Sequence, residues 1–211
     1  NKLWTGMAKE TAHQIGTPLS SLLGWIAILK MEKINEKYVS EIEKDVHRLN
    51  TIANRFSKIG SVPELKKENI VHITKQVYDY LESRSSKQIL FTFYSERKEL
   101  FVNLNNELFG WVIENLIKNA IDAMQKEGAL KLEIAPIGKN VKICISDSGK
   151  GMHKSLFKQI FKPGFTTKKR GWGLGLSLSK RIVEDYHKGK ISVKKSEIGK
   201  GTTFEILLAR V

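Results

Sequence analysis

The stretch ELFGWVIENLIKNAIDAM (107–124) decides the fold of this chain. Apolar residues recur along it at three- and four-residue steps, which predicts an amphipathic helix whose broad apolar face lies on a sheet. Asn115 and Asn119 are four residues apart, so they share one face of the same helix. Two asparagines at this spacing also occur on ordinary polar helix surfaces, and their meaning depends on the neighbouring segments. The apolar face comprises Phe109, Val112, Ile113, Leu116, Ala120 and Ile121.

Segments on both sides of this helix alternate between apolar and polar residues, which is typical of strands. Mixed strands with helices on one face predict an α/β sandwich of two layers. Further helices are expected at 70–81 and 174–186. We expect strands at 89–94, 100–104, 130–135, 141–147, 190–194 and 203–208, with a turn at 136–140.

Asp147 ends a predicted strand and opens the sequence DSGKG (147–151). Such a sequence is common in tight turns. It also fixes a carboxylate at a strand end, where it can accept a hydrogen bond from an adenine amino group. Gly149 and Gly151 would then let the backbone approach the base closely.

A second glycine cluster, GWGLGLS (171–177), precedes the predicted helix 174–186. Backbone N–H groups at a glycine-rich helix start favour an anion. The cluster is neither a dinucleotide fingerprint nor a Walker loop, because no strand directly precedes it and no Gly-Lys-Ser/Thr closes it. Between the two clusters lies LFKQIFKPGFTTKKR (156–170), whose phenylalanines Phe157, Phe161 and Phe165 have the spacing of core residues on a helix.

The first part of the chain is helical in pattern. Apolar residues at helical spacing in 2–31, a polar break at 32–35 and a second periodic run from Tyr38 to Ile59 predict an antiparallel helical hairpin. A hairpin of this kind leaves its apolar stripe half uncovered, and a second copy would bury it in a four-helix bundle. We therefore expect a homodimer through residues 2–59. Gly60–Pro63 breaks the helix and begins a linker over 60–65.

His13 lies in AHQIGTPLSS (12–21), one turn before Pro18. Proline cannot donate to the carbonyl of Gln14, so the helix should bend after His13 and leave the imidazole accessible. A neutral imidazole is a competent nucleophile near its ordinary pKa of about 6.5. An isolated histidine on such a helix would be an ordinary surface residue. The histidines at 47, 72, 153 and 187 lack such surroundings and are expected to be structural or surface residues.

Together, these segments resemble the core of the two-component sensor histidine kinases, and the resemblance covers nearly the whole chain. His13, Thr17 and Pro18 match the family's His-acid-x-x-Thr/Asn-Pro segment. The resemblance implies an α+β fold: a dimerisation and phosphotransfer hairpin at 1–59, the linker at 60–65, and an ATP-binding domain of the Bergerat type at 66–211. It further implies that ATP phosphorylates His13 and that a response-regulator aspartate in a receiver domain then accepts the phosphoryl group.

The same resemblance implies roles for the nucleotide segments. The side-chain oxygen of Asn119 would coordinate Mg²⁺, which takes hard oxygen ligands, and Asn115 and Lys118 would contact the phosphates or the metal shell. Phe161 would belong to the hinge of a mobile lid. The remaining residues expected to bind ATP are Asp147, Gly149, Gly151, Thr166, Thr167, Lys168, Gly171, Gly173, Leu174, Gly175 and Thr202.

Gln14 departs from the family, which places Glu or Asp after the histidine to orient the imidazole and take its proton. An amide cannot accept that proton at neutral pH. Three accounts are compatible with Gln14: a slower kinase that uses water or another carboxylate, a chain biased towards dephosphorylation, and an inactive kinase. Thr17 occupies the position at which the family positions a hydrolytic water, which is compatible with phosphatase activity on a partner. Trp172 is bulky where the family usually has a small residue.

Asn115 separates two enzyme classes. Related ATPases (gyrases, mismatch-repair proteins and heat-shock chaperones) carry a water-activating glutamate four residues before the metal asparagine, and this chain has Asn115 there. We therefore favour phosphoryl transfer over hydrolysis. The alternatives are a kinase-like scaffold that binds nucleotide and docks a regulator without phosphorylating it, and a hydrolytic ATPase.

Composition narrows the remaining classes. The 211 residues are 41% hydrophobic and 27% charged, as in globular proteins. The single Cys144 excludes an internal disulfide and a cysteine-built metal site. There is no apolar run of membrane-spanning length, so we expect a cytoplasmic location, with any membrane anchor in an upstream segment. The net charge of +14 comes from lysines scattered through the chain, with no nucleic-acid motif, so we expect a solvated basic surface and no nucleic-acid partner.

Overall fold

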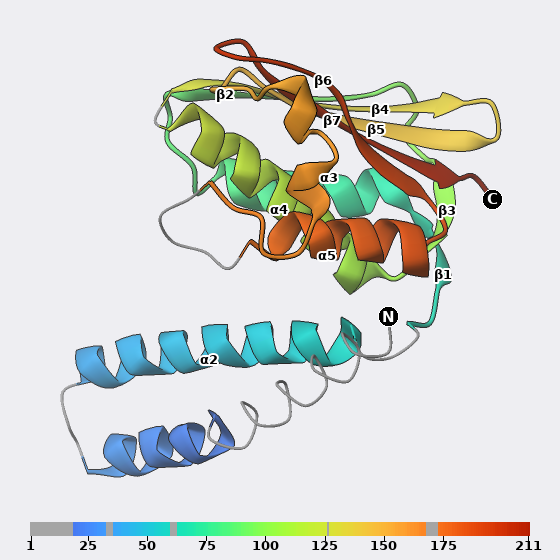
Figure 1. Cartoon of the computed structure of the whole chain (residues 1–211). Helices are drawn as coiled ribbons and strands as arrows, with labels where there is room; N and C mark the ends of the chain where they lie inside the picture. Colours follow the sequence, from blue (N-terminus) through green and yellow to red (C-terminus); the bar gives the residue numbers. More distant parts are fainter. Residues whose placement is uncertain (1–18, 33–35, 60–62, 126, 168–172) are drawn as a thin grey trace. The chain divides into compact units, whose positions relative to one another are not determined.

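The computed structural model describes residues 19–32, 36–59, 63–125, 127–167 and 173–211 (Figure 1). For residues 41, 45, 48 and 51–59 it describes the backbone alone. The chain divides into two compact units, Asn1–Pro63 and Glu64–Val211. His13, Gln14 and Thr17 lie outside the described residues, as do Lys168 and Gly171.

The first unit contains a helix over 19–31 and the helix α2 (Glu36–Ile59). The two helices pack through four buried residues, with Leu23 and Leu29 at the margin. The amino group of Lys30 lies 2.7 Å from a carboxylate oxygen of Glu43, which joins the helices near the turn. The helical hairpin predicted from the sequence is confirmed over the described residues. The four buried residues are Leu19, Ile26, Val39 and Val46.

Neither of these helices, nor any other in the described ranges, is long and apolar enough to cross a bilayer.

The second unit is built on a five-stranded sheet of order β2-β4-β5-β7-β6. Strands β2 and β4 are parallel, and the other neighbours are antiparallel. A separate antiparallel pair, β1 and β3, stands beside the sheet. The strand bounds are Lys66–Asn69 for β1, Ile89–Ser95 for β2, Phe101–Leu104 for β3, Gly128–Ile137 for β4, Asn140–Asp147 for β5, Lys190–Glu197 for β6 and Gly201–Ala209 for β7.

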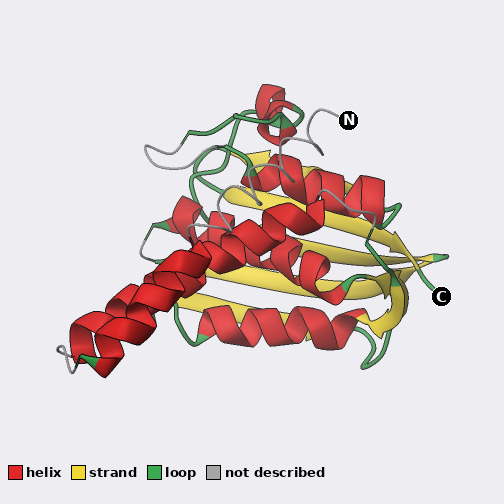
Figure 2. Cartoon of the chain, turned by 90° about the horizontal axis from the view of Figure 1, so that it is seen from below, coloured by secondary structure: helices red, strands yellow, loops and turns green. Residues whose placement is uncertain are grey.

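The helices of this unit lie on one face of the sheet, as both views show (Figure 1, Figure 2). They are α3 (Ile70–Glu82), α4 (Asn106–Met124) and α5 (Gly175–Arg181). A π-helical segment, η3 (Ile182–Tyr186), continues α5, and two short 3₁₀ turns, η1 (Lys154–Leu156) and η2 (Gln159–Phe161), follow β5. The two-layer α/β architecture is therefore confirmed.

Helix α4 forms the centre of the core, as its sequence pattern predicted. Phe109, Val112, Ile113 and Leu116 are fully buried. They belong to one cluster with the inward-facing residues of β4, β5 and β7. Burial of each such side chain contributes about 1.5–3 kcal/mol, so this face fixes α4 on the sheet. Polar residues, among them Asn115, Lys118 and Asn119, lie outside this buried face.

Strands β6 and β7 extend beyond their predicted bounds, the 3₁₀ turns η1 and η2 were not predicted, and three further differences have a physical reason. Strand β1 was not predicted, because its sequence Lys-Lys-Glu-Asn is polar and its residues are exposed or half-buried. The turn between β4 and β5 is shorter than predicted, since Ile137 already pairs with Asn140. The helix predicted at 174–186 changes its hydrogen bonding after Arg181, where the amide of His187 donates to the carbonyl of Ile182 at 3.1 Å.

Candidate nucleotide site

Asn105 anchors the start of α4 with four hydrogen bonds. Its side-chain oxygen caps the helix by accepting from the amide of Leu108, and its backbone carbonyl accepts from the amide of Phe109. Its side-chain nitrogen donates to the carbonyl of Glu64 at 3.2 Å. Its backbone N–H donates to Nε2 of His187 at 2.9 Å. The position of α4 is thus tied both to the first residue of this unit and to the end of η3.

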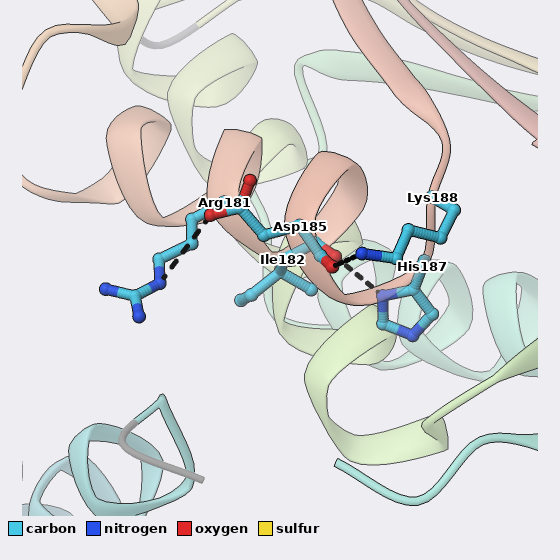
Figure 3. A network of polar contacts seen from close by, with 5 residues as sticks. All are labelled: Arg181, Ile182, Asp185, His187 and Lys188. Atoms are coloured by element: carbon cyan, nitrogen blue, oxygen red, sulfur yellow. Dashed lines mark hydrogen bonds and ion pairs between the residues drawn. The ribbon is translucent and has the colours of Figure 1, made fainter. Parts of the chain in front are cut away.

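His187 is buried and serves as a structural bridge. Its Nδ1 donates to the carbonyl of Ile182 at 2.8 Å (Figure 3). Its Nε2 accepts from the backbone N–H of Asn105. The ring therefore carries one proton, on Nδ1. Burial lowers the pKa of His187 from its usual value. His187 was expected to be either a structural or a surface residue, and the structure shows that it is structural. Its partners are 82 and five residues away in the sequence, and no local pattern indicates them.

Asn115 joins α4 to the start of α5. Its Nδ2 donates to the hydroxyl of Ser179 at 2.9 Å, and Ser179 is 2% exposed. A Cβ added to Gly175 would lie 2.5 Å from Oδ1 of Asn115. A larger residue at 175 would have to displace this side chain. The structure thus brings together the asparagine helix and the second glycine cluster.

Lys118 and Asn119 continue the polar face of α4. Asn119 is half-buried and Lys118 is exposed. The amino group of Lys118 lies 2.5 Å from a carboxylate oxygen of Glu114. In the described part of the chain, no group of three or more His, Cys, Asp or Glu residues could hold a metal ion. The polar face of α4 thus offers an amide oxygen and a cation within one turn of each other.

Asp147 lies at the end of β5 and is 9% exposed. Its Oδ1 accepts from the amide of Gly149 at 2.8 Å, and the backbone N–H of Thr202 also donates to the carboxylate. Burial raises the pKa of Asp147, and these two hydrogen bonds oppose that effect. Because the folded protein disfavours the charged form, the carboxylate costs stability at neutral pH. Carboxylates kept at such a cost are concentrated at functional sites.

Three glycines shape the loop around Asp147. Gly151 has φ +62°, and a Cβ there would lie 1.9 Å from the carbonyl oxygen of Glu197. Gly201 has φ +97°, and a Cβ there would lie 1.8 Å from the carbonyl oxygen of Asp147. Gly149 lies against the backbone of Ala123 at the end of α4. The close approach that these glycines permit in this structure is to protein backbone, which holds the loop between α4 and the β6–β7 hairpin.

Between the two glycine clusters, the predicted residues lie in different environments. Phe161 is buried in the core, edge-on to Phe204 with ring centroids 6.3 Å apart. Thr166 and Thr167 are exposed, and the hydroxyl of Thr167 lies 3.5 Å from the amino group of Lys150. The segment after η2 is therefore adjacent to the DSGKG loop.

The two ends of the segment 164–173 meet. The amide of Gly164 donates to the carbonyl of Gly173 at 3.0 Å, and Gly173 has φ +64°. Leu174 and Gly175 follow at the start of α5, where the carbonyl of Leu174 accepts from the amide of Leu178 and from the hydroxyl of Ser177. After Gly173 the chain therefore enters α5 beside the polar face of α4, where Gly175 lies against Asn115.

The structure thus groups the described site residues around α4. Asn115 contacts the start of α5, Asp147 contacts Thr202, and the loop that follows Asp147 packs on the end of α4. Phe161 is separate from these contacts, in the core. Ser179 was not predicted as a site residue, because a serine on a helix carries no signal of a partner 64 residues away.

Two protein-family descriptions match parts of this chain. Residues 105–211 match the family described as histidine kinase-, DNA gyrase B- and HSP90-like ATPase. Residues 4–61 match the His Kinase A (phospho-acceptor) domain. Residues 105–211 therefore belong to an ATP-binding domain of this superfamily, and a phospho-acceptor domain precedes it.

Within this superfamily, the individual proteins that the chain resembles are histidine kinases. Sporulation kinase C of Bacillus subtilis (strain 168) is 30% identical over 207 residues, which are 96% of this chain and 48% of the relative. The solved catalytic domain of histidine kinase ThkA is 32% identical, with a TM-score of 0.65 over 70% of this chain and 97% of that domain. ThkA in complex with the response regulator protein TrrA is 28% identical, with a TM-score of 0.65 over 98% of this chain and 61% of that chain.

The chain belongs to the two-component sensor histidine kinase family and corresponds to its catalytic core. It spans about half the length of sporulation kinase C.

Proposed function

We propose that this chain is an ATP-dependent protein-histidine kinase that phosphorylates its own His13 and passes the phosphoryl group to an aspartate of a response regulator. One observation carries the proposal: a phospho-acceptor match over residues 4–61, which contains His13, precedes an ATP-binding match over 105–211 in one chain. The complex of ThkA with the response regulator protein TrrA supports the choice of partner.

Asp147 would recognise the adenine base. A carboxylate has acceptor sites on both oxygens, and the amides of Gly149 and Thr202 use part of them. The exocyclic amino group of adenine would donate to the remainder. Because the carboxylate is buried, a purine without that donor would leave its acceptor unsatisfied, and this makes the contact selective.

The polar face of α4 would bind the phosphates. Asn119 offers a neutral amide oxygen of the kind that Mg²⁺ accepts beside phosphate oxygens and water. Bound Mg²⁺ would neutralise charge on the phosphates. Lys118 would add a positive charge, and Asn115, held by Ser179, would keep the start of α5 against this face. Thr166, Thr167 and Lys168, together with Gly171 and Gly173, would enclose the phosphate end.

The transfer itself forms one bond and breaks another. Nε2 of His13 would attack the γ-phosphorus in line, the N–P bond would form, and the bond to the β–γ bridging oxygen would break to release ADP. Most of the rate would come from positioning and charge stabilisation. The proton on Nδ1 of His13 must leave, and Gln14 cannot take it. Water or another carboxylate would accept it, which predicts a slow reaction.

Partners and location follow from the same assignment. The first unit exposes several large apolar residues, and a second copy would cover them in a four-helix bundle. A homodimer through residues 2–59 in the cytoplasm is thus part of the proposal. Thr17 extends it to phosphatase activity on the regulator. The exposed residues are Leu22, Trp25, Ile28, Met31, Tyr38, Ile42 and Leu49.

Gln14 favours one second candidate, a scaffold that binds nucleotide and docks a regulator without phosphorylating it. The two are separated by incubating the chain with γ-labelled ATP and Mg²⁺. The kinase gives acid-labile, alkali-stable label that disappears in His13→Ala and persists in the control His47→Ala, which removes an exposed histidine of α2. Nucleotide binding without label would indicate the scaffold. Free phosphate without labelled protein would indicate an ATPase.

A further inference from the structure

Ser196, near the end of β6, lies at a junction of three segments. Its hydroxyl accepts from the amide of Met152 at 2.9 Å and donates to the carbonyl of Gly201 at 3.0 Å. The hydroxyl of Thr202 lies 2.8 Å from the same oxygen. Since a serine hydroxyl donates once and accepts twice, these contacts use its full capacity.

A β-bulge decides which way Ser196 points. The register of β6 against β7 pairs Val193 with Phe204 and then Lys195 with Thr203, so one residue is extra. Without that residue, Ser196 would share a face with Ser192, because side chains alternate along a strand. The bulge moves Ser196 to the opposite face and aligns it with Thr202. Bulges often re-aim a side chain beside a functional site.

The face that Ser196 joins is that of Asp147. Asp147 pairs with Thr202 across β5 and β7, and Thr202 pairs with Ser196 across β7 and β6. The three residues therefore form one cross-strand row. Thr202 also donates its backbone N–H to the Asp147 carboxylate. Ser196 is thus connected to Asp147 along two routes, through Thr202 on β7 and through Met152 at the far end of the loop.

We infer that Ser196 is a positioning residue for adenine recognition: it holds the loop 147–152 and Thr202 so that the Asp147 carboxylate meets the amino group of the base. This inference rests on the proposed contact between Asp147 and adenine. Loss of the hydroxyl leaves the Met152 amide without its acceptor. The loop keeps its other hydrogen bonds, among them that from the amide of Gly199 to the carbonyl of Lys150 at 2.8 Å and that from the amide of Lys150 to the carbonyl of Ala123 at 3.1 Å. Removing the Ser196 hydroxyl should therefore loosen the row while the unit stays folded.

Binding of two nucleotides to the full 211-residue chain tests the inference. ATP and purine riboside triphosphate differ in the exocyclic amino group, so their affinity ratio reports the contact that Asp147 makes. We expect the wild-type chain to bind ATP about tenfold more tightly than the analogue, the value of one good hydrogen bond to a charged group. Ser196→Ala should reduce this ratio to about twofold, mainly by weakening ATP.

Two controls separate positioning from general damage. Ser146→Ala removes a hydroxyl that pairs with Thr203 at 2.9 Å on the opposite face of the sheet, next to Asp147, and should keep the tenfold ratio. Ser196→Thr and Ser196→Val have nearly the same shape, and the ratio should persist in the threonine variant alone. This pair also decides the question should the alanine variant fail to fold.

The outcomes are distinct. A wild-type chain without preference for ATP, unchanged in Asp147→Asn, would overturn the proposed adenine contact. A preference that Asp147→Asn abolishes and Ser196→Val retains would overturn the role of Ser196 alone. Equal weakening of both nucleotides in Ser196→Val would also overturn it, because that result describes a structural residue.

Discussion

The side-chain nitrogen of Asn115 on α4 donates to the hydroxyl of Ser179 on α5 at 2.9 Å, and the other end of the same amide lies against Gly175. One amide therefore spans the first turn and the middle of α5. Because the buried face of α4 fixes that helix on the sheet, this contact also restrains the position of α5. A displacement of Gly173 and Leu174, which lead into α5, would strain this contact.

Ser179→Ala tests this link. The substitution leaves the Asn115 amide without a partner in a half-buried place, which should cost about 1–3 kcal/mol in the free energy of unfolding. ATP affinity should fall at the same time, because the start of α5 is no longer held against α4. Urea unfolding and nucleotide titration measure the two effects. The matched control is Ser177→Ala, whose hydroxyl bonds only within its own helix turn, to Leu174; equal losses in both variants would contradict the link.

Alanine substitutions at two glycines distinguish the cost of a left-handed backbone from the cost of a steric clash. Gly138 and Gly151 have nearly the same φ, +56° and +62°. Alanine at Gly138 meets nothing within 4 Å, whereas at Gly151 it meets the carbonyl of Glu197. Gly138→Ala should therefore cost only the left-handed conformation, about 1–2 kcal/mol. Gly151→Ala should cost more in urea unfolding and should also abolish ATP binding, because it displaces the loop that follows Asp147.

The buried His187 predicts a pH dependence. Burial lowers its pKa in the folded protein below the value of 6.5 that applies to the unfolded chain. The unfolded chain therefore binds more protons as the pH falls through about 6.5, and stability is lost in that window, by at most about 1.4 kcal/mol per pH unit for one proton. Above it the contribution is fully present.

Urea unfolding at pH 7.5 and 5.5 measures this contribution. His187→Gln should lower stability at pH 7.5, where the bridge between Asn105 and Ile182 is intact, and should reduce the difference between the two pH values. His72→Gln, at an exposed position of α3, should leave that difference unchanged. A wild-type chain equally stable at both values would show that protonation of His187 is tolerated in the fold.

The sequence pattern predicted the elements that are long and periodic. Helix α4 and the central strands were predicted because burial on one face leaves a period in the sequence. Strand β1 was missed because it pairs only with β3 and is half exposed, so its polar residues show no alternation. The π-helical end of α5 was missed because it depends on His187, which receives a bond from Asn105.

The candidate site shows the same division. Asp147, Gly151 and Gly173 were indicated because strand ends and positive φ restrict the choice of residue. Ser179 and Ser196 were not indicated, because Asn115 and Met152, the partners that tie them to the site, are 64 and 44 residues away and serine is frequent on any surface. The role of Ser196 also depends on the bulge in β6, and one extra residue in a strand reverses the faces that alternation predicts.

The exposed apolar residues of α2 predict the dimer. Ile42 and Leu49 are seven residues apart, on one face of α2, and are 44% and 47% exposed. Ile42→Glu would place a charge in the proposed interface and should shift the chain to a monomer in analytical ultracentrifugation. His47→Glu adds the same charge about 140° around the helix and should leave the dimer intact. Dissociation by both variants would show that α2 responds to charge in general.

Gln14 provides the last test, since it adjoins the proposed phosphorylation site and departs from its family. Gln14→Glu restores a carboxylate that can orient the imidazole of His13 and accept its proton. General-base catalysis contributes about 10²–10⁴-fold when the base is well placed, so the initial rate of His13 labelling with γ-labelled ATP should rise by about 10²-fold. Gln14→Asn, which changes length without adding a base, should give no increase. An unchanged rate in Gln14→Glu, with labelling still dependent on His13, would mean that proton removal does not limit the transfer and that positioning of the two units does.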